Sequence, residues 1–212
     1  MVAVTISFRP IAAFQYIRRS CRRDPGPLAP AHHIQRPIPD HTMPVLVKPT
    51  KIKLEWTDFE ESGASLQDHD AEAGYDSEFV PANFTPRKIR KRAHLPATYT
   101  IRVWPMLQVA PGANTSDELL AHEQLHYDVG IVCAKALARE LDGLNAVDPA
   151  ELLTLVNDLH ELHMFTRADA IQKAYDVQTE HGKKAEMQKQ WQDAMAQCLA
   201  KRSITRIMGL PL

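Results

Sequence analysis

Two histidines and a glutamate lie close together in residues 122–126, His-Glu-Gln-Leu-His. On a helix, residues four apart lie on one face, with Cβ atoms roughly 5–6 Å apart. The imidazoles of His122 and His126 can therefore bind one metal ion, and zinc is the usual choice for such a pair. Glu123 would lie beside that ion, placed to take a proton from a metal-bound water. The spacing thus predicts zinc-dependent hydrolysis with Glu123 as the general base.

A catalytic zinc needs a third protein ligand and keeps its fourth position for water. Residues 175–182, Tyr-Asp-Val-Gln-Thr-Glu-His-Gly, are the best source. His181 precedes a glycine and can leave the helical path toward the metal. Asp176 and Glu180 can either bind the ion or orient a histidine, and Tyr175 can stabilise the oxyanion of a tetrahedral intermediate. An exposed helix end without a function is the open alternative for this segment.

The motif needs a helix to carry it. A capping box of Thr115 and Glu118 predicts a start there, and Gly143 is a natural residue to follow an end near Asp142. The inner face of this helix is predicted from three- and four-residue spacing. It consists of Leu119, His122, His126, Val129, Cys133 and Leu137. The two histidines therefore continue an apolar stripe.

Two stretches before this helix alternate polar and apolar residues, as half-buried strands do. They are residues 51–56 and residues 98–104, the second ended by Pro105. Residues 98–104 are predicted to be the edge strand that binds substrate by backbone pairing. The acidic residues 60–78 between the two stretches favour a solvated loop or a weak hairpin.

Two helical regions are predicted after Gly143. Asp148 as N-cap, Pro149 at N1 and Glu151 at N3 begin the first, which runs to residues 181–182 with a break near Thr166. The second covers residues 184–202, with an apolar face of Met187, Trp191, Met195, Cys198 and Leu199. His160 and His163 are three apart on the first of these helices, and either bind metal, face a cleft or are partly exposed.

The composition is that of a soluble globular protein of 212 residues, 44% hydrophobic and 24% charged. The net charge of −1 gives no reason to expect a nucleic-acid partner. Five positive charges in residues 87–92 are the exception, and the acidic segment before them is expected to neutralise them. No apolar run is long enough to cross a membrane. The three cysteines imply no disulfide framework.

Three blocks of the sequence resemble one known family. They are Leu54, Trp56, Asp58 and Phe59; then residues 119–128, Leu-Leu-Ala-His-Glu-Gln-Leu-His-Tyr-Asp; and last Tyr175, Asp176, Thr179, His181 and Gly182, followed by Gln188 and Trp191. The order and spacing resemble a bacterial family of secreted zinc-dependent proteases classed as a domain of unknown function. Leu125 and Tyr127 depart from the family pattern without touching the chemistry.

The resemblance implies a role for each matched residue. His122 and His126 would be zinc ligands, Glu123 the general base and His181 the third ligand, with Asp176 next in order. Asp128, which lies off the histidine face, would be a structural or supporting carboxylate. The resemblance also implies an exported or cell-envelope location and a peptide or protein substrate, whereas the first residues show no clear export signal.

The overall prediction is an α+β, zincin-like fold, in which a small antiparallel sheet precedes the HExxH helix and C-terminal helices follow. Residues 1–50 are expected to be a disordered or dispensable extension, residues 51–205 the metallopeptidase domain and residues 206–212 a tail. One alternative is a non-catalytic zinc-binding structural or adaptor protein on the same scaffold. The other is a helical interaction protein in which the motif is fortuitous.

Overall fold

The computed structural model describes residues 4–5, 45–62, 66 and 70–212, so most of the predicted extension lies outside the described residues. The helices are α1 (Asp117–Leu141), α2 (Pro149–His160), α3 (Ala168–Thr179) and α4 (Ala185–Ala200). The strands are β1 (Val4–Thr5), β2 (Leu46–Pro49), β3 (Glu60–Glu61), β4 (Ala71–Val80), β5 (Asn83–Phe84), β6 (Arg87–Ile89), β7 (Arg92–His94), β8 (Thr100–Val109), β9 (Asn145–Ala146), β10 (Arg206–Ile207) and β11 (Leu210–Pro211). Helices and small sheets together agree with the predicted α+β class.

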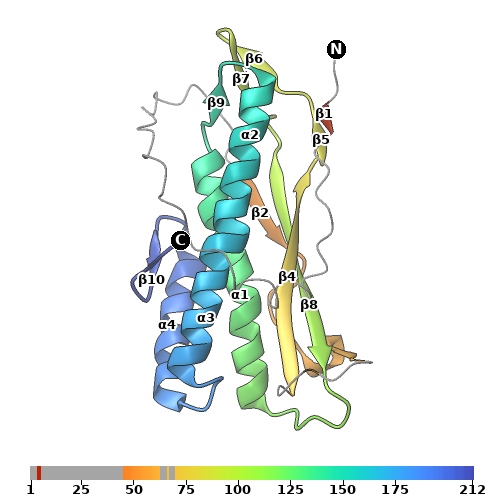
Figure 1. Cartoon of the computed structure of the whole chain (residues 1–212), viewed down its shortest axis with the longest axis vertical. Helices are drawn as coiled ribbons and strands as arrows, with labels where there is room; N and C mark the ends of the chain where they lie inside the picture. The colour runs from red at the N-terminus through yellow and green to blue at the C-terminus, as the bar shows by residue number, and fades with distance from the viewer. Residues whose placement is uncertain (1–3, 6–44, 63–65, 67–69) are drawn as a thin grey trace, which may run out of the picture.

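The main sheet is mixed, not antiparallel as predicted. β8 lies at its centre, with β2 and β3 parallel to it and β4 antiparallel to it over ten paired positions. The predicted strand at residues 98–104 therefore exists in β8, but the prediction that it forms an edge is wrong. Among the described strands β4 pairs only with β8, and it lies beside α1 (Figure 1).

β8 continues past Pro105, where the sequence predicted its end. Pro105 lies opposite Tyr75 of β4, and Ala73, two residues before Tyr75, points its N–H away from β8 toward Glu123. Pro105 thus belongs to a non-hydrogen-bonded pair, and its nitrogen faces away from β4. On that side β2 pairs only as far as Val103 and β3 begins only at Gln108. No ladder hydrogen bond is lost there, which is why the strand tolerates a proline.

The prediction of a loop or weak hairpin at residues 60–78 is wrong for its second half, because β4 covers most of it. Ala71, Ala73 and Phe79 of β4 are buried, whereas the acidic residues Glu72 and Asp76 alternate with this set and are partly exposed. This is the two-residue period of a strand with one covered face. The density of acids concealed that pattern in the sequence.

Residues 51–56 are not the predicted strand, although Leu54 is buried. Their backbone is bound by a side chain of α1: the Leu54 N–H donates to Gln124 Oε1 at 2.7 Å, and Gln124 Nε2 donates to the Ile52 carbonyl at 3.3 Å. A 3₁₀ turn, Trp56–Asp58, follows. The alternation of polar and apolar residues does not mark a covered face in this segment, because Ile52 is 73% exposed.

α1 matches its predicted length and lies between the sheet and the other helices (Figure 1). Its N-cap is Ser116 rather than Thr115, since the Ser116 hydroxyl accepts from Leu119 N at 3.1 Å. Gly143 follows the helix with φ +75°, as predicted. The predicted inner stripe is confirmed, with Val129, Cys133 and Leu137 fully buried.

A π-helical segment, Glu161–Arg167, joins α2 to α3 at the place where the sequence predicted a break near Thr166. A π turn leaves its carbonyls poorly paired within the helix, and here the Tyr75 hydroxyl donates to the Met164 carbonyl at 2.6 Å. The Tyr75 ring reaches that carbonyl across Gly130 of α1, where a Cβ would lie 2.2 Å from Tyr75 Cγ. The strand, α1 and the π turn therefore fit together at one point.

Short strands lie on both sides of the predicted domain. β2 lies before residue 51 and pairs with β8. The predicted tail at residues 206–212 forms the β10–β11 hairpin, with Ile207 and Leu212 buried. Arg167 Nη1 donates to the Leu212 carbonyl at 2.6 Å and attaches this hairpin to the helices. No helix in the described part of the chain has the length and apolar character that crossing a bilayer requires.

Candidate metal site

Three donor atoms from α1 and α3 converge in the first half of α1. The Nε2 atoms of His122 and His126 lie 3.1 Å apart, and Asp176 Oδ1 lies 3.4 Å from the first and 3.0 Å from the second. All three donors lie within 4.8 Å of one another, and both imidazoles are buried. The predicted pair of histidines on one helical face is thus placed together with a carboxylate from α3.

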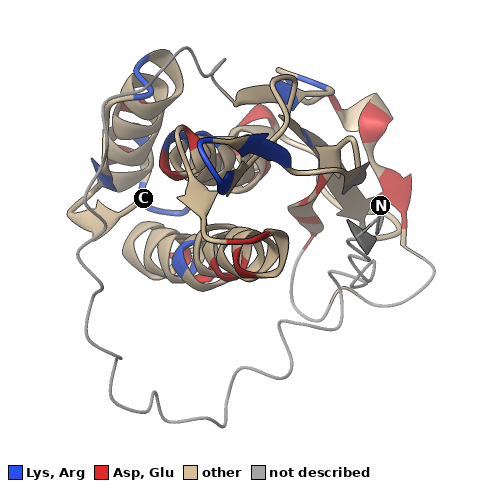
Figure 2. Cartoon of the chain, turned by 90° about the horizontal axis from the view of Figure 1, so that it is seen from above, with Lys and Arg blue, Asp and Glu red and all other residues tan. Residues whose placement is uncertain are grey.

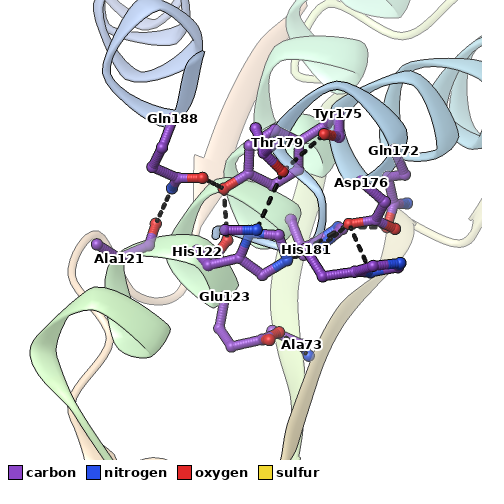
Figure 3. Close-up of polar contacts among 12 residues, drawn as sticks. Ala73, Ala121, His122, Glu123, Gln172, Tyr175, Asp176, Thr179, His181 and Gln188 are labelled. Carbon is purple, nitrogen blue, oxygen red and sulfur yellow. Dashed lines mark hydrogen bonds and ion pairs between the residues drawn. The ribbon is translucent and has the colours of Figure 1, made fainter. Parts of the chain in front are cut away.

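Each imidazole is oriented by contacts away from the three donors. His126 Nδ1 lies 3.1 Å from Gln172 Oε1, which fixes the proton on Nδ1 and leaves Nε2 as the donor to a metal. The Tyr175 ring stacks on His122, with centroids 4.7 Å apart. The Tyr175 hydroxyl donates to Gln188 Oε1 at 2.7 Å and lies 3.3 Å from the His122 carbonyl. Figure 3 shows these contacts on the α3 and α4 side of the site.

These contacts bear on the oxyanion role predicted for Tyr175. Its side chain is fully buried, and its hydroxyl is directed at Gln188 and the backbone of α1. A donor to an oxyanion must instead point at the place where the reacting oxygen would lie. The geometry favours a positioning role for Tyr175, in which its ring supports His122.

Asp176 and His181, the two leading candidates for third ligand, occupy different surroundings. Asp176 lies on α3 before the helix ends, and its carboxylate faces the imidazoles. His181 follows the helix with φ +54°, its side chain is 54% exposed, and its Nδ1 lies 3.9 Å from Asp176 Oδ1. It stays outside the group of three donors. Of these two candidates, Asp176 therefore shares the donor group with His122 and His126 and His181 does not. Glu180, with an exposed side chain paired to Lys184, is not in the group either.

The end of α3 closes over His122. Gly182, with φ +81°, lies so close that a Cβ there would be 3.3 Å from His122 Nδ1. The Thr179 hydroxyl accepts from Gly182 N at 3.1 Å and donates to the Tyr175 carbonyl at 2.8 Å, which fixes this turn (Figure 3). The left-handed glycine is needed both for the backbone conformation and for the close approach.

The charges of the three donors depend on one another. Burial would raise the pKa of Asp176, but its interactions with the imidazoles of His122 and His126 outweigh burial and hold that pKa well below its ordinary value. Burial lowers the pKa of His122. For His126 burial acts in the same direction, but the Asp176 carboxylate outweighs it and raises the pKa. Asp176 is therefore an anion that faces two imidazoles.

Glu123 leaves α1 on a side facing the sheet. Its Oε2 accepts from the Ala73 N–H of β4 at 2.6 Å, and the side chain is buried. Burial raises the pKa of this carboxyl to about 7, against the lowering effects of His126 and the Ala73 hydrogen bond. A carboxyl with that pKa can accept and release a proton near neutral pH. Figure 3 shows Glu123 reaching from α1 toward Ala73.

The donor set suits a metal ion. Two imidazole Nε2 atoms and a carboxylate oxygen lie within one small volume, where their lone pairs repel one another. A proton on His126 alone can offset only part of this repulsion. Asp176 Oδ1 is buried without an ordinary hydrogen-bond partner in the structure, and its only close polar neighbours named above are histidine nitrogens. Two histidines and a carboxylate are a set of protein ligands found in catalytic zinc sites. The residues present therefore fit a divalent cation.

His160, His163 and Asp128 lie apart from this donor group. Asp128 accepts from Gln124 Nε2 at 2.9 Å and so supports the docked segment at residues 52–54, as a structural carboxylate would. His163 is fully buried beside Glu140, with Nε2 and Oε1 3.1 Å apart. His160 Nε2 lies 3.3 Å from Ser77 Oγ. His160 and His163 therefore have separate partners, and neither joins the three donors.

Sequence reasoning missed Gln172 and the contact between Glu123 and Ala73. Gln172 lies four residues before Asp176 and so on the same helical face, which is a signal that spacing contains. Ala73 offers no such signal, because its contribution is a backbone N–H. Comparison with family models, curated proteins and solved structures found no match for this chain.

Proposed function

We propose that this protein is a zinc-dependent metallopeptidase of zincin-like architecture, with His122, His126 and Asp176 as metal ligands. The observation that carries the proposal is the convergence of these three donors. The buried Glu123 lies on α1, the helix that also carries the two histidines. A site built only to bind metal has no need of that glutamate. The resemblance of three sequence blocks to secreted zinc-dependent proteases supports the same reading.

In the proposed reaction, Glu123 does the proton chemistry. A bound zinc ion would supply Lewis-acid polarisation of a water molecule and of the scissile carbonyl. Glu123 accepts the proton of the attacking water at its carboxylate and then passes it to the leaving amine. The buried surroundings of Glu123 keep the carboxyl away from competing solvent.

The strand β4 supports a peptide as the proposed substrate class. An extended peptide can add to a strand edge through main-chain hydrogen bonds, and the outer edge of β4 carries no further strand among the described residues. This edge passes Glu123 at Ala73. We therefore assign to β4 the substrate-binding role that the sequence had suggested for residues 98–104.

The substitution Glu123→Gln tests the catalytic role. Its amide cannot accept the water proton, so turnover of a peptide substrate should fall by at least about a hundredfold, while bound zinc, measured by elemental analysis, should stay at the wild-type stoichiometry. Glu118→Gln, in the first turn of the same helix, is the matched control and should leave both unchanged. Undiminished hydrolysis in Glu123→Gln would refute the assignment, whereas stoichiometric zinc without hydrolysis in wild type would favour a non-catalytic metal site.

A further inference from the structure

A basic hairpin lies away from the metal site, at the end of the molecule where α1 finishes. β6 and β7 form it, and Arg87, Lys88, Arg90, Lys91 and Arg92 are all exposed. Figure 1 shows the hairpin at one end of the molecule, and Figure 2 shows its Lys and Arg residues on one ribbon. The first turn of α1, which precedes the metal site, lies at the other end in Figure 1.

The described part of the acidic segment that was expected to neutralise the hairpin lies mostly in β4. Residues 71–80 form β4, which pairs with β8, and Glu78 forms an ion pair with Arg102 of β8 at 2.7 Å. Since the whole chain carries −1 and residues 87–92 carry +5, the remaining residues carry a formal charge of −6. Five of the 25 lysines and arginines therefore lie on one short hairpin of a chain whose other residues are net acidic.

The hairpin is held in a fixed position. β7 pairs with β9, and Arg92 Nε donates to Asn145 Oδ1. Its two-residue turn consists of Arg90 and Lys91, with φ +48° and +68°. Glycine or asparagine is the usual choice in such a turn, so two long cationic side chains are presented at the tip where smaller residues would fit more easily.

The positive field is already felt by a neighbouring side chain. His94 lies opposite Arg87 on the paired strand. Burial lowers the pKa of His94, and the charges of Arg87 and Arg92 lower it further. Cations close enough to disfavour a proton on His94 will favour an anion in the same region.

The arrangement of the cations points to a particular anion. Residues directly opposite in an antiparallel pair share a face, so Arg87 and Arg92 lie on one face, Lys88 lies on the other, and Arg90 and Lys91 lie at the tip. A flat anionic surface can meet only the tip or one face. A groove with phosphates along both walls can meet the tip and both faces. The major groove of B-form DNA admits a two-stranded ribbon, and the hairpin is two-stranded beyond Ala93 and His94, the residues that pair with β9.

We propose that the β6–β7 hairpin binds double-stranded DNA through its phosphates, with the ribbon in the major groove. The hairpin has no Phe, Tyr or Trp on which a base could stack. Contacts of its cations to phosphates are therefore expected to dominate, and binding should depend little on sequence. This inference is independent of the proposed peptidase activity, since no residue of the hairpin belongs to the metal site.

The experiment is fluorescence anisotropy of a labelled 20-base-pair duplex titrated with the full chain at several salt concentrations. The logarithm of the binding constant should fall with the logarithm of salt concentration, with a slope of about −4.5 for five neutralised phosphates. The double variant K88Q/K91N should weaken binding about tenfold or more and make the slope shallower by about 2. Asparagine at position 91 suits the left-handed backbone.

The control variant K173Q/K189Q removes the same charge from exposed lysines of α3 and α4, which pair with Asp169 and Asp193. It should bind DNA like wild type. Absence of duplex binding by wild type, or equal binding by K88Q/K91N with an unchanged melting temperature, would overturn the proposal. So would hairpin-dependent binding to phosphatidylserine vesicles without binding to the duplex, because that result identifies a membrane as the partner.

Discussion

Asp176 and His181 show how much one turn of backbone decides at the scale of a residue. Both residues are candidates for the third ligand beside His122 and His126. Asp176 lies on the regular part of α3, whereas His181 follows the helix in a left-handed conformation. The helix directs the Asp176 carboxylate at the imidazoles, whereas the His181 side chain is half exposed. The burial of a donor, and not only its type, decides which residue can serve as a ligand.

This difference predicts the metal content of two variants. Asp176→Asn keeps the shape but removes the negative charge, and it should weaken zinc binding by about ten- to a hundredfold, as measured by competition with a chromophoric chelator. His181→Asn should change zinc affinity by less than about threefold. If the His181 variant loses zinc and the Asp176 variant keeps it, the original order of the two candidates is correct.

Much of the site could be predicted from residues alone. The pair of histidines and their adjacent glutamate follow from helical spacing, and that spacing holds in α1. The third donor could not be fixed in this way, because Tyr175 to Gly182 offers several donors and only the end of α3 selects among them. The contact of Glu123 with Ala73 involves a backbone N–H, which side-chain patterns do not reveal.

At the scale of elements, strand β4 is attached to the helices by inward-facing positions two residues apart. Ala73 N donates to Glu123, the Tyr75 hydroxyl donates to the Met164 carbonyl, and Ser77 Oγ lies beside His160. The number of acids in this stretch concealed the strand, although these acids alternate with the inward residues. The prediction of a strand at residues 51–56 is wrong although its residues alternate, because the Gln124 side chain binds the backbone of this segment instead.

Gly130 makes this attachment possible. Its replacement by alanine should change the free energy of unfolding in the direction opposite to that usual in helices. In most helices Gly→Ala stabilises by about 1 kcal/mol. Here the added Cβ would lie 2.2 Å from Tyr75 Cγ, so Gly130→Ala should lower the free energy of unfolding by about 1–3 kcal/mol, measured with urea. In a Tyr75→Ala background the same change should be neutral or stabilising, and an equal loss in both backgrounds would contradict the steric explanation.

At the scale of the whole molecule, buried histidines link folding to pH. Burial lowers the pKa of His160 from 6.5 to about 4, with Phe79 and Phe165 rings beside it. The unfolded chain therefore binds this proton more readily than the folded one. The stability that depends on neutral His160 is complete above about pH 6.5 and is lost as the pH falls toward 4.

The prediction concerns the difference between two proteins in that pH window. Between pH 7.5 and pH 4.5, wild type should lose about 2–3 kcal/mol more unfolding free energy than His160→Gln. Urea unfolding in the presence of a chelator measures this without a contribution from metal binding. Parallel pH profiles for the two proteins would show that His160 does not titrate as the structure indicates.

The α+β class of the described residues could be predicted from the sequence, but the short strands β2, β10 and β11 could not. α1 was recognisable from its cap, its stripe and Gly143, and the helices that follow were recognisable from Asp148 and from the apolar spacing around Trp191. β2 and the β10–β11 hairpin are only four and two residues per strand. Their stability comes from β8 and Arg167, which are distant in sequence. The local sequence pattern of these strands therefore does not predict them.

The π-helical segment has a consequence for the chemistry at the far end of its helix. An α-helix advances by about 100° per residue, so one extra residue in a wide turn rotates everything after it by that angle. Asp176 lies about two and a half turns beyond Arg167, and its direction toward His122 and His126 is set by this rotation. The π-helical segment, which accepts a hydrogen bond from Tyr75, thus sets the rotation of α3 about its own axis. The loss of one residue there would turn Asp176 away from the imidazoles, although no ligand residue would be changed.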